Sequence, residues 1–493
     1  MARLLTLLVW TCLPLSSWGE VPAEVLTIQQ TMHRIIDRAE PSVASIAVSR
    51  SDQYREFRGS ISTDLSGKLG SFFSRTWLAD PNLPDERKQL LRRLDLSTPD
   101  SIPDSFGTGI VIDPAGLILT TWHVVRDATR VYIRMPSGQG SYADIHAADM
   151  RADLAVLRLQ NPIRGLKPLE FGAAEKARKG DLIVALANSF NSGFRDGSPS
   201  ATWGILSNLR RRPPGSTREE DRTNNKPLSH YGTMFQLDST LNPGSSGGVV
   251  LDLEGRAIAI LSATAGQVGG DRAGGFAFPL DRNMRRIIEV LKRGEEVEYG
   301  FLGISLMSQD FATNPGVTIG VVAPGSAAER AGLYPSDTIV AIDDRPVRDQ
   351  DDLFLHIGAA LCGNEVRIRT QSVRGIGNVT ATLSRSGSSG NSIASRRPAP
   401  VFGLRVESTS TLTQKTLPIG VAVREIEPNS PAAKKVAPRK ANARIVVEKV
   451  NGKVVRTPIE FYAEAAIDPE TVELTVIDAD DTTAASRRTI RLP

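Results

Sequence analysis

The stretch Asn242 to Gly248, NPGSSGG, constrains the fold of this chain more than any other part of the sequence. It lies between two apolar runs, and its glycines permit backbone conformations that are closed to other residues. The run that follows, Val249 to Ile260, has the pattern of strand, turn and strand. Ser246 is therefore a candidate nucleophile on a turn between strands, provided that a base can take its proton. An ordinary Gly/Ser turn is the alternative, and only a base and an orienting acid elsewhere in the chain favour the nucleophile.

Both partners occur upstream. His123 follows the apolar run LIL where a strand is expected to end, and Asp153 opens the strand-like run DLAVLRL, where a carboxylate is costly to bury without a hydrogen-bond donor. The order His123, Asp153, Ser246 is that of chymotrypsin and differs from the orders of subtilisin and the α/β-hydrolases. GSSGG also fits the G-x-S-x-G elbow, but an elbow requires a following helix and a downstream triad histidine. The sequence therefore favours the chymotrypsin arrangement, with Asp149 as the alternative acid.

Five segments together carry a family resemblance: TTWHVV, ADLAVL, NPGSSGG, SFGTGIVID and GGFAFP. The chain resembles the HtrA (Do/Deg) family of serine proteases over nearly its whole length. The resemblance implies a mainly β protein with a chymotrypsin-like double antiparallel β-barrel protease domain, followed by two PDZ (α+β) domains. It also implies roles for individual residues: His123 is the general base, Asp153 orients it, Ser246 is the nucleophile, and the amides of Gly244 and Ser246 form the oxyanion hole. Ser245 departs from the asparagine usual in the family, a change that we expect to be tolerated because this position contributes mainly backbone.

The N-terminus has the layout of a secretory signal peptide. Residues 1–19 contain Arg3, an apolar core from Leu4 to Leu15 and small residues near the end. We therefore expect cleavage and a periplasmic or secreted protein without a stable membrane span, and an uncleaved anchor is the alternative. Of the two cysteines, Cys12 lies in this segment, so the mature chain would hold Cys362 alone and no intrachain disulfide.

The expected protease domain spans residues 27–294. Residues 51–103 form a long insertion rich in Gly, Ser, Asp, Pro and charge, and it is either the regulatory loop that the resemblance implies or a disordered segment. A second insertion, residues 210–230, lies where the family has a loop that senses PDZ occupancy. Asp281 is expected to cap a final helix that Gly294 ends.

After that helix the sequence repeats itself loosely, which predicts two copies of one module. Each copy resembles a PDZ domain, and the resemblance implies one PDZ domain at 298–385 and a second at 399–493. In the first, the loop formed by Phe301, Leu302, Gly303 and Ile304 is expected to bind the carboxylate of a peptide that adds a strand to the sheet edge. The second copy lacks the RAGLYPSD segment of the first, so we expect it to bind peptides weakly. The linker at 386–398, within a Ser-, Gly-, Arg- and Pro-rich stretch, is expected to be a flexible tether.

The composition of the chain mainly excludes other classes of protein. A formal net charge of +4 on 59 basic and 55 acidic residues is not that of a nucleic-acid-binding protein, and no cofactor or metal is expected. The sequence predicts an exported, ATP-independent serine endopeptidase that acts on unfolded or misfolded envelope proteins. Its expected partners are these substrates, peptides with apolar C-termini, and further copies of the chain in a homotrimer or larger assembly. A holdase chaperone or peptide-binding scaffold on the same architecture, and a narrowly specific processing protease, are the alternatives.

Overall fold

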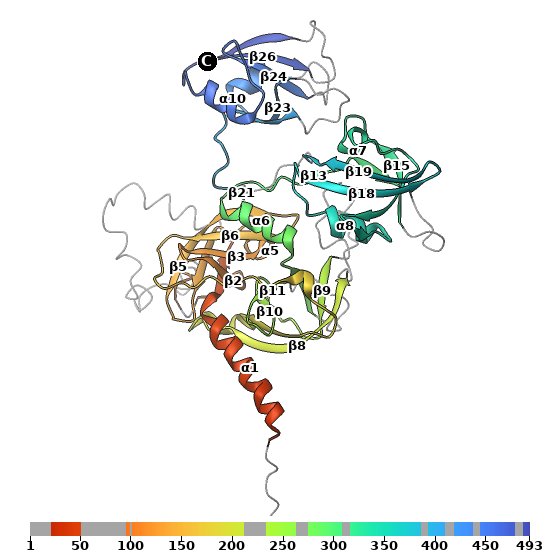
Figure 1. Ribbon diagram of the computed structural model, residues 1–493. Helices are drawn as coiled ribbons and strands as arrows, with labels where there is room; N and C mark the ends of the chain where they lie inside the picture. The colour runs from red at the N-terminus through yellow and green to blue at the C-terminus, as the bar shows by residue number, and fades with distance from the viewer. Residues whose placement is uncertain are drawn as a thin grey trace, which may run out of the picture.

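A computed structural model of the chain describes residues 21–50, 95–98, 101–211, 233–262, 275–307, 316–385, 393–409, 419–436, 444–478 and 487–493. The expected signal peptide and most of the 51–103 insertion lie outside these residues. Three folded parts follow one another along the chain: a pair of packed β-barrels, a middle unit and a C-terminal unit (Figure 1). None of the helices among the described residues is both long enough and apolar enough to cross a membrane.

The first barrel follows the N-terminal helix α1 (Ala23–Ala39) and the 3-10 turn η1 (Glu40–Ser42). Its strands run in the order β5, β4, β1, β2, β3, β6, and pairing of β5 with β6 closes it. The strands are β1 (Val43–Ser49), β2 (Ser105–Asp113), β3 (Leu117–Thr121), β4 (Arg130–Arg134), β5 (Gly140–Asp149) and β6 (Leu154–Leu159), with the short helix α5 (Trp122–Val125) after β3. All strands pair antiparallel with their neighbours, as the sequence predicts for a β-barrel domain.

The second barrel closes in the order β10, β11, β12, β9, β8, β7. Its elements are β7 (Leu182–Ala187), β8 (Ser200–Arg211), β9 (Met234–Leu237), β10 (Val249–Leu251), β11 (Ala257–Leu261) and β12 (Gly275–Pro279), with the 3-10 segments η2 (Ala174–Lys176) and η3 (Ser189–Phe194). One buried cluster joins side chains of both barrels, among them Ile110 and Val184, to the helix α6 (Arg282–Lys292). The predicted double barrel is therefore confirmed.

The helix α6 forms where the sequence predicts it. The side chain of Asp281 accepts a hydrogen bond from Met284 N at 2.8 Å, which satisfies one of the free donors of the first turn. Met284, Ile287, Ile288 and Leu291 repeat at helical spacing and are buried. Gly294, with φ of 74°, takes the left-handed conformation that ends a helix at low cost.

The middle unit and the C-terminal unit share one topology. The middle sheet runs β14, β15, β16, β18, β19 with β17 beside β16, and the C-terminal sheet runs β22, β23, β24, β26, β27 with β25 beside β24. The middle unit comprises β13 (Gly300–Phe301), β14 (Ile304–Leu306), β15 (Val317–Val322), α7 (Ala327–Arg330), β16 (Thr338–Ile342), β17 (Arg345–Pro346), α8 (Gln350–Ile357), β18 (Glu365–Ser372), β19 (Gly375–Thr382) and β20 (Ser384–Arg385). The C-terminal unit comprises β22 (Leu404–Ser408), β23 (Val421–Ile426), α9 (Pro431–Lys435), β24 (Ile445–Val450), β25 (Lys453–Val454), α10 (Pro458–Ala465), β26 (Val472–Asp478) and β27 (Arg488–Leu492).

The prediction of a flexible tether is wrong for the second half of the linker. The strand β21 (Ile393–Ala394) pairs antiparallel with β5, so the linker adds an edge strand to the first barrel. Next to it, Ser395 N donates to His146 O at 2.9 Å, and the Ser395 hydroxyl lies 2.7 Å from His146 Nδ1. Backbone pairing of this kind depends on a free strand edge far away in the chain, which the linker composition does not reveal.

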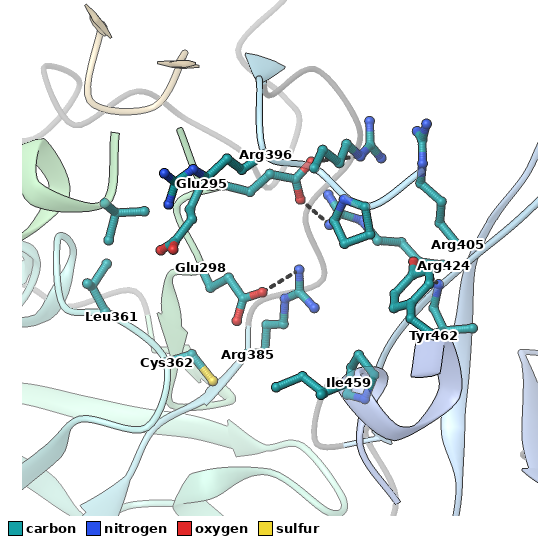
Figure 2. A pocket seen from close by; sticks show the side chains of 16 residues that line it. Glu295, Glu298, Leu361, Cys362, Arg385, Arg396, Arg405, Arg424, Ile459 and Tyr462 are labelled. Atoms are coloured by element: carbon teal, nitrogen blue, oxygen red, sulfur yellow. Dashed lines mark hydrogen bonds and ion pairs between the residues drawn. The ribbon is translucent and has the colours of Figure 1, made fainter. Parts of the chain in front are cut away.

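A pocket of about 560 Å³ lies where the three parts meet, and many of the side chains that line it are charged (Figure 2). Arg385 of the middle unit lies 2.9 Å from Glu298. Arg424 of the C-terminal unit and Arg397 of the linker both pair with Glu296, which directly follows the end of the protease domain. These ion pairs link the linker and the C-terminal unit to the chain that leaves α6.

Candidate active site

Strand pairing brings His123 and Asp153 together. His123 lies in α5, directly after β3, and Asp153 lies directly before β6, the neighbour of β3 in the sheet. Asp153 Oδ1 accepts from the backbone N–H of His123 at 3.0 Å, and Oδ2 lies 2.6 Å from His123 Nδ1. A carboxylate in this place holds the ring in one orientation and keeps the proton on Nδ1, so that Nε2 is free to act as a base.

Ser246 lies on the other side of the same imidazole. Its Oγ is 2.8 Å from His123 Nε2, and the residue is 5% exposed. The structure therefore brings together all three residues that the sequence singled out, in the hydrogen-bonded order Asp153, His123, Ser246. Asp149, the alternative acid, has different partners and forms no hydrogen bond with His123 among the described residues: it accepts from Ala152 N at 2.8 Å and from the hydroxyl of Tyr299.

The turn before Ser246 has a defined geometry. Ser245 N donates to Asn242 O at 3.0 Å and Gly244 has φ of 91°, which is the pattern of a type II turn with proline at its second position. A Cβ on Gly244 would lie 2.3 Å from Asn188 O, so only glycine fits. Phe190 N donates to Pro243 O at 2.7 Å. Because the peptide unit is planar and trans, the N–H of Gly244 then points in the opposite direction from that carbonyl.

Ser245, which replaces the family's usual asparagine, fills its site with hydrogen bonds. It is 2% exposed, its Oγ lies 3.1 Å from Ser189 Oγ, and it accepts from Asn242 N at 3.3 Å. The side chain thus ties the turn to η3 and to its own beginning.

The loop predicted to bind peptides lies at the edge of the middle unit. β14 is the terminal strand of its sheet, so one of its edges is open to an added strand. Gly303 has φ of 84°, and a Cβ there would lie 2.1 Å from the Cβ of Ser326. Backbone carbonyls of this loop are already used, since Leu302 O accepts from Ala328 N and Gly303 O from Ala323 N, both at 2.8 Å. These two hydrogen bonds hold the loop in place through its carbonyl oxygens.

The corresponding loop of the C-terminal unit is closed on itself. Val401 N donates to Leu404 O at 2.9 Å, and Leu404 N donates to Val401 O at 2.8 Å. Phe402 and Gly403 between them have φ of 51° and 89°, the signs of a type I′ turn. The amide of Leu404, which corresponds to that of Ile304, is thus occupied by the protein's own backbone.

Two contacts near the site were missed from the sequence. Arg210, one residue before the end of β8, forms an ion pair with Asp352, a 1% exposed side chain in α8 of the middle unit. Tyr299, just before the predicted peptide-binding loop, donates its hydroxyl to Asp149, and burial raises the pKa of both groups. Sequence reasoning placed the 210–230 insertion where the family has a loop that senses PDZ occupancy, but residues 212–232 lie outside the described part, and no sequence signal indicated that Asp352 pairs with Arg210.

Known proteins share both parts of this architecture. The Trypsin-like peptidase domain family matches residues 107–260, and the PDZ domain family matches residues 291–370. Among solved structures, the "HtrA-type protease AlgW with tripeptide" matches with a TM-score of 0.48 and 21% identity, over 75% of this chain and 98% of the other.

Sequence relatives extend across the protease domain and the units that follow. The chain is 28% identical over 439 residues to the "Probable periplasmic serine endoprotease DegP-like" of Chlamydia pneumoniae, which covers 84% of this chain and 82% of the relative. It is 30% identical over 352 residues to the "Periplasmic pH-dependent serine endoprotease DegQ" of Escherichia coli (strain K12), which covers 68% of this chain and 72% of the relative. With a trypsin-like domain, a PDZ domain and relatives of this kind, the chain belongs to the HtrA family and is a serine endopeptidase of the HtrA type.

Proposed function

We propose that this protein is an exported, ATP-independent endopeptidase that degrades unfolded or misfolded envelope proteins through the triad His123, Asp153 and Ser246. The observation that carries the proposal is the continuous hydrogen-bonded chain from Asp153 Oδ2 through the imidazole to Ser246 Oγ, with spacings of 2.6 and 2.8 Å. The names of the relatives, which are periplasmic serine endoproteases, support the cell envelope as its location.

The geometry supports the following sequence of steps. His123 Nε2 takes the proton of Ser246 as Oγ attacks the scissile carbonyl, and Asp153 stabilises the imidazolium that forms. The amides of Gly244 and Ser246 receive the negative oxygen of the tetrahedral intermediate. The imidazolium then gives its proton to the leaving amine, and water hydrolyses the acyl-enzyme by the same route in reverse.

A matched pair of variants tests this role. Ser246→Ala should lower the turnover of casein by about a million-fold, the loss seen in a comparable triad, and should abolish labelling by a fluorophosphonate probe. Ser245→Ala removes the neighbouring hydroxyl of the same turn, which does not reach His123, and should still be labelled. Labelling that persists in Ser246→Ala and disappears in Ser245→Ala would show that Ser245, and not Ser246, is the nucleophile.

A holdase chaperone and a narrowly specific processing protease are the competing functions. A purely binding protein would need no ordered triad, so the 2.6 and 2.8 Å contacts favour an enzyme. Comparing the cleavage of casein with that of individual envelope proteins separates the broad protease from the processing enzyme. Suppression of aggregation by Ser246→Ala would reveal a holdase activity in addition to proteolysis.

The contact between Arg210 and Asp352 supports regulation by peptides. It joins β8 of the second barrel to α8, the helix that would form one wall of the peptide groove if the middle unit binds peptides as the family resemblance implies. A peptide that moves α8 would change this ion pair, and through β8 the segment that leads to the oxyanion turn. Typical couplings between two sites are about 1 to 3 kcal/mol, or roughly 5- to 150-fold. Arg210→Ala should therefore change the degree to which a non-cleavable peptide with an apolar C-terminus stimulates cleavage of a short chromogenic substrate.

The exposed half of α1 supports self-assembly. The helix projects away from the barrels (Figure 1), and its first turns, with the residue before them, expose apolar side chains: Val21, Val25, Leu26 and Ile28 are 43 to 54% exposed. Such side chains in one segment are typical of an interaction surface. We propose that they contribute to a homotrimer or larger assembly, and light scattering of Leu26→Asp against the wild type would show a fall in mass if they do.

A further inference from the structure

One buried residue of the first barrel contacts the oxyanion turn of the second barrel at two points. Thr108 lies in β2 and is 0% exposed. Its hydroxyl donates to Gly244 O at 2.8 Å, and its backbone N–H donates to Ser246 O, also at 2.8 Å. Gly244 and Ser246 are the two residues whose amides are proposed to form the oxyanion hole. Thr108 thus holds both of them by their carbonyls and leaves the amides of the hole untouched.

The same residue connects the turn to two other segments of the site. Thr108 Oγ1 accepts from Asn188 N at 2.8 Å, and Asn188 begins the segment in which Phe190 N anchors Pro243 O. Thr108 O accepts from Thr120 Oγ1 at 2.7 Å, and Thr120 lies in β3, the strand that leads to His123. One hydroxyl therefore acts as donor and acceptor at once and joins β2, the η3 segment and the turn.

Water cannot replace the hydrogen bonds of the Thr108 hydroxyl, because the groups that make them are buried. Asn188 is 1% exposed, and a Cβ on Gly247 would lie 2.0 Å from Thr108 O, so the strands and the turn are in direct contact. Without the hydroxyl, Asn188 N–H and Gly244 C=O would both be buried without a hydrogen bond, and the backbone would have to shift to recover them. A shift at Gly244 moves the amide that receives the oxyanion, and such donors act only at a defined position.

We propose that Thr108 is a positioning residue for proteolysis, whose hydroxyl fixes the oxyanion turn in its productive geometry. This inference rests on the proposed roles of Ser246 and Gly244. It concerns the transition state rather than substrate binding, because Thr108 is fully buried and contacts the turn through the carbonyls of Gly244 and Ser246, not through their amides.

The test compares three variants of the full chain in steady-state cleavage of a chromogenic peptide. Thr108→Val keeps the shape of the side chain and removes the hydroxyl. We expect kcat to fall roughly 10- to 100-fold, less than the 10²–10³-fold cost of deleting an oxyanion donor, with little change in KM. Thr108→Ser keeps the hydroxyl and should recover most of the lost kcat. Thr121→Val is the matched control, since Thr121 is equally buried and its hydroxyl has no hydrogen-bond partner among the described residues.

Two further readouts separate positioning from a general loss of structure. The acid limb of the pH profile of kcat/KM should be the same in Thr108→Val and the wild type, because the contacts of His123 are intact. The intrinsic tryptophan fluorescence of the folded protein should also be unchanged. An unaltered kcat in Thr108→Val, or equal losses in the Val and Ser variants, would overturn the inference. Failure of the fluorophosphonate to label Ser246 in the wild type would instead overturn the proposed function itself.

Discussion

The buried pair of Asp149 and Tyr299 allows a sharp prediction about stability. Asp149 ends β5, Tyr299 belongs to the segment that joins α6 to the middle unit, and the two are 6% and 7% exposed. Tyr299→Phe removes the hydroxyl that donates to the carboxylate and leaves Ala152 N as its remaining donor among the contacts described. A buried acceptor deprived of a donor costs about 1 to 3 kcal/mol, and a charged one costs more. We therefore expect the free energy of unfolding of the protease domain to fall by at least about 1 kcal/mol at neutral pH.

The pH dependence of this loss has a definite sign. Burial raises the pKa of Asp149, and the hydrogen bond from Tyr299 opposes that rise. A carboxyl whose pKa is higher in the folded than in the unfolded state contributes stability below its unfolded pKa, about 4, and this contribution is lost as the pH rises through the folded pKa. Tyr299→Phe raises the folded pKa further. The difference between variant and wild type should therefore be small near pH 4 and grow toward pH 8, and in an Asp149→Asn background its pH dependence should disappear.

Tryptophan fluorescence isolates the relevant transition, because no tryptophan occurs after residue 203. Urea unfolding followed by this signal reports on the protease domain and not on the two units after it. Tyr132→Phe is the matched control: Tyr132 is also 7% exposed, but its hydroxyl has no hydrogen-bond partner among the described residues. If Tyr299→Phe and Tyr132→Phe lost equal stability at pH 8, or if the loss did not depend on pH, the assigned role of the hydrogen bond would be wrong.

Three further predictions address the site, the peptide-binding units and the linker. Asp153→Asn should lower kcat by about 10⁴-fold, because an amide donating toward the ring favours the wrong tautomer, and wild-type rates in this variant would exclude Asp153 from the triad. A fragment of residues 298–385 should bind peptides with apolar C-termini, whereas 399–493 should bind them weakly because Leu404 N is occupied, and equal affinities in a calorimetric titration would contradict this. Burial lowers the pKa of His146, which faces Ser395, Lys292 O and the guanidinium groups of Arg158 and Arg396. Its stabilising effect is present above its ordinary pKa near 6.5 and lost as the pH falls through the folded pKa. The protection of the amides of 393–397 against exchange, relative to the intrinsic exchange rate at each pH, should therefore fall in acid, and His146→Gln should remove that pH dependence.

Local sequence signals predicted the elements that carry the chemistry. Each triad residue lies in a short segment with a recognisable pattern: a histidine at the end of a strand, an aspartate at the start of another, and a serine on a glycine-rich turn. Chain order then distinguished the double barrel from the alternatives, and Asp281 and Gly294 marked the ends of α6. These features depend on a few neighbouring residues, so the sequence alone contained them.

The loops at 51–103 and 210–230 show where local signals stop being informative. Of the first, the structure describes 95–98 and 101–103, and Leu96 is 0% exposed and packs in one cluster with Tyr132 and Phe194. Leu96 is one of four leucines between residues 90 and 96, and the sequence gave no indication of which of them would be anchored. Whether a loop residue is anchored depends on the cavity that it meets, and that cavity is built by distant strands.

The sequence by itself determined the protease class, the chain order of His123, Asp153 and Ser246, and the loose repeat in the segments that follow the protease domain. Tertiary structure decided which distant groups meet: Thr108 with Gly244, Tyr299 with Asp149, Arg210 with Asp352, and the linker strand with β5. Each of these contacts joins segments that lie more than one hundred residues apart. The physical reason is that periodicity, capping and turn chemistry act over a few residues, whereas a buried hydrogen bond or a paired strand edge exists only once two separately formed elements have packed together.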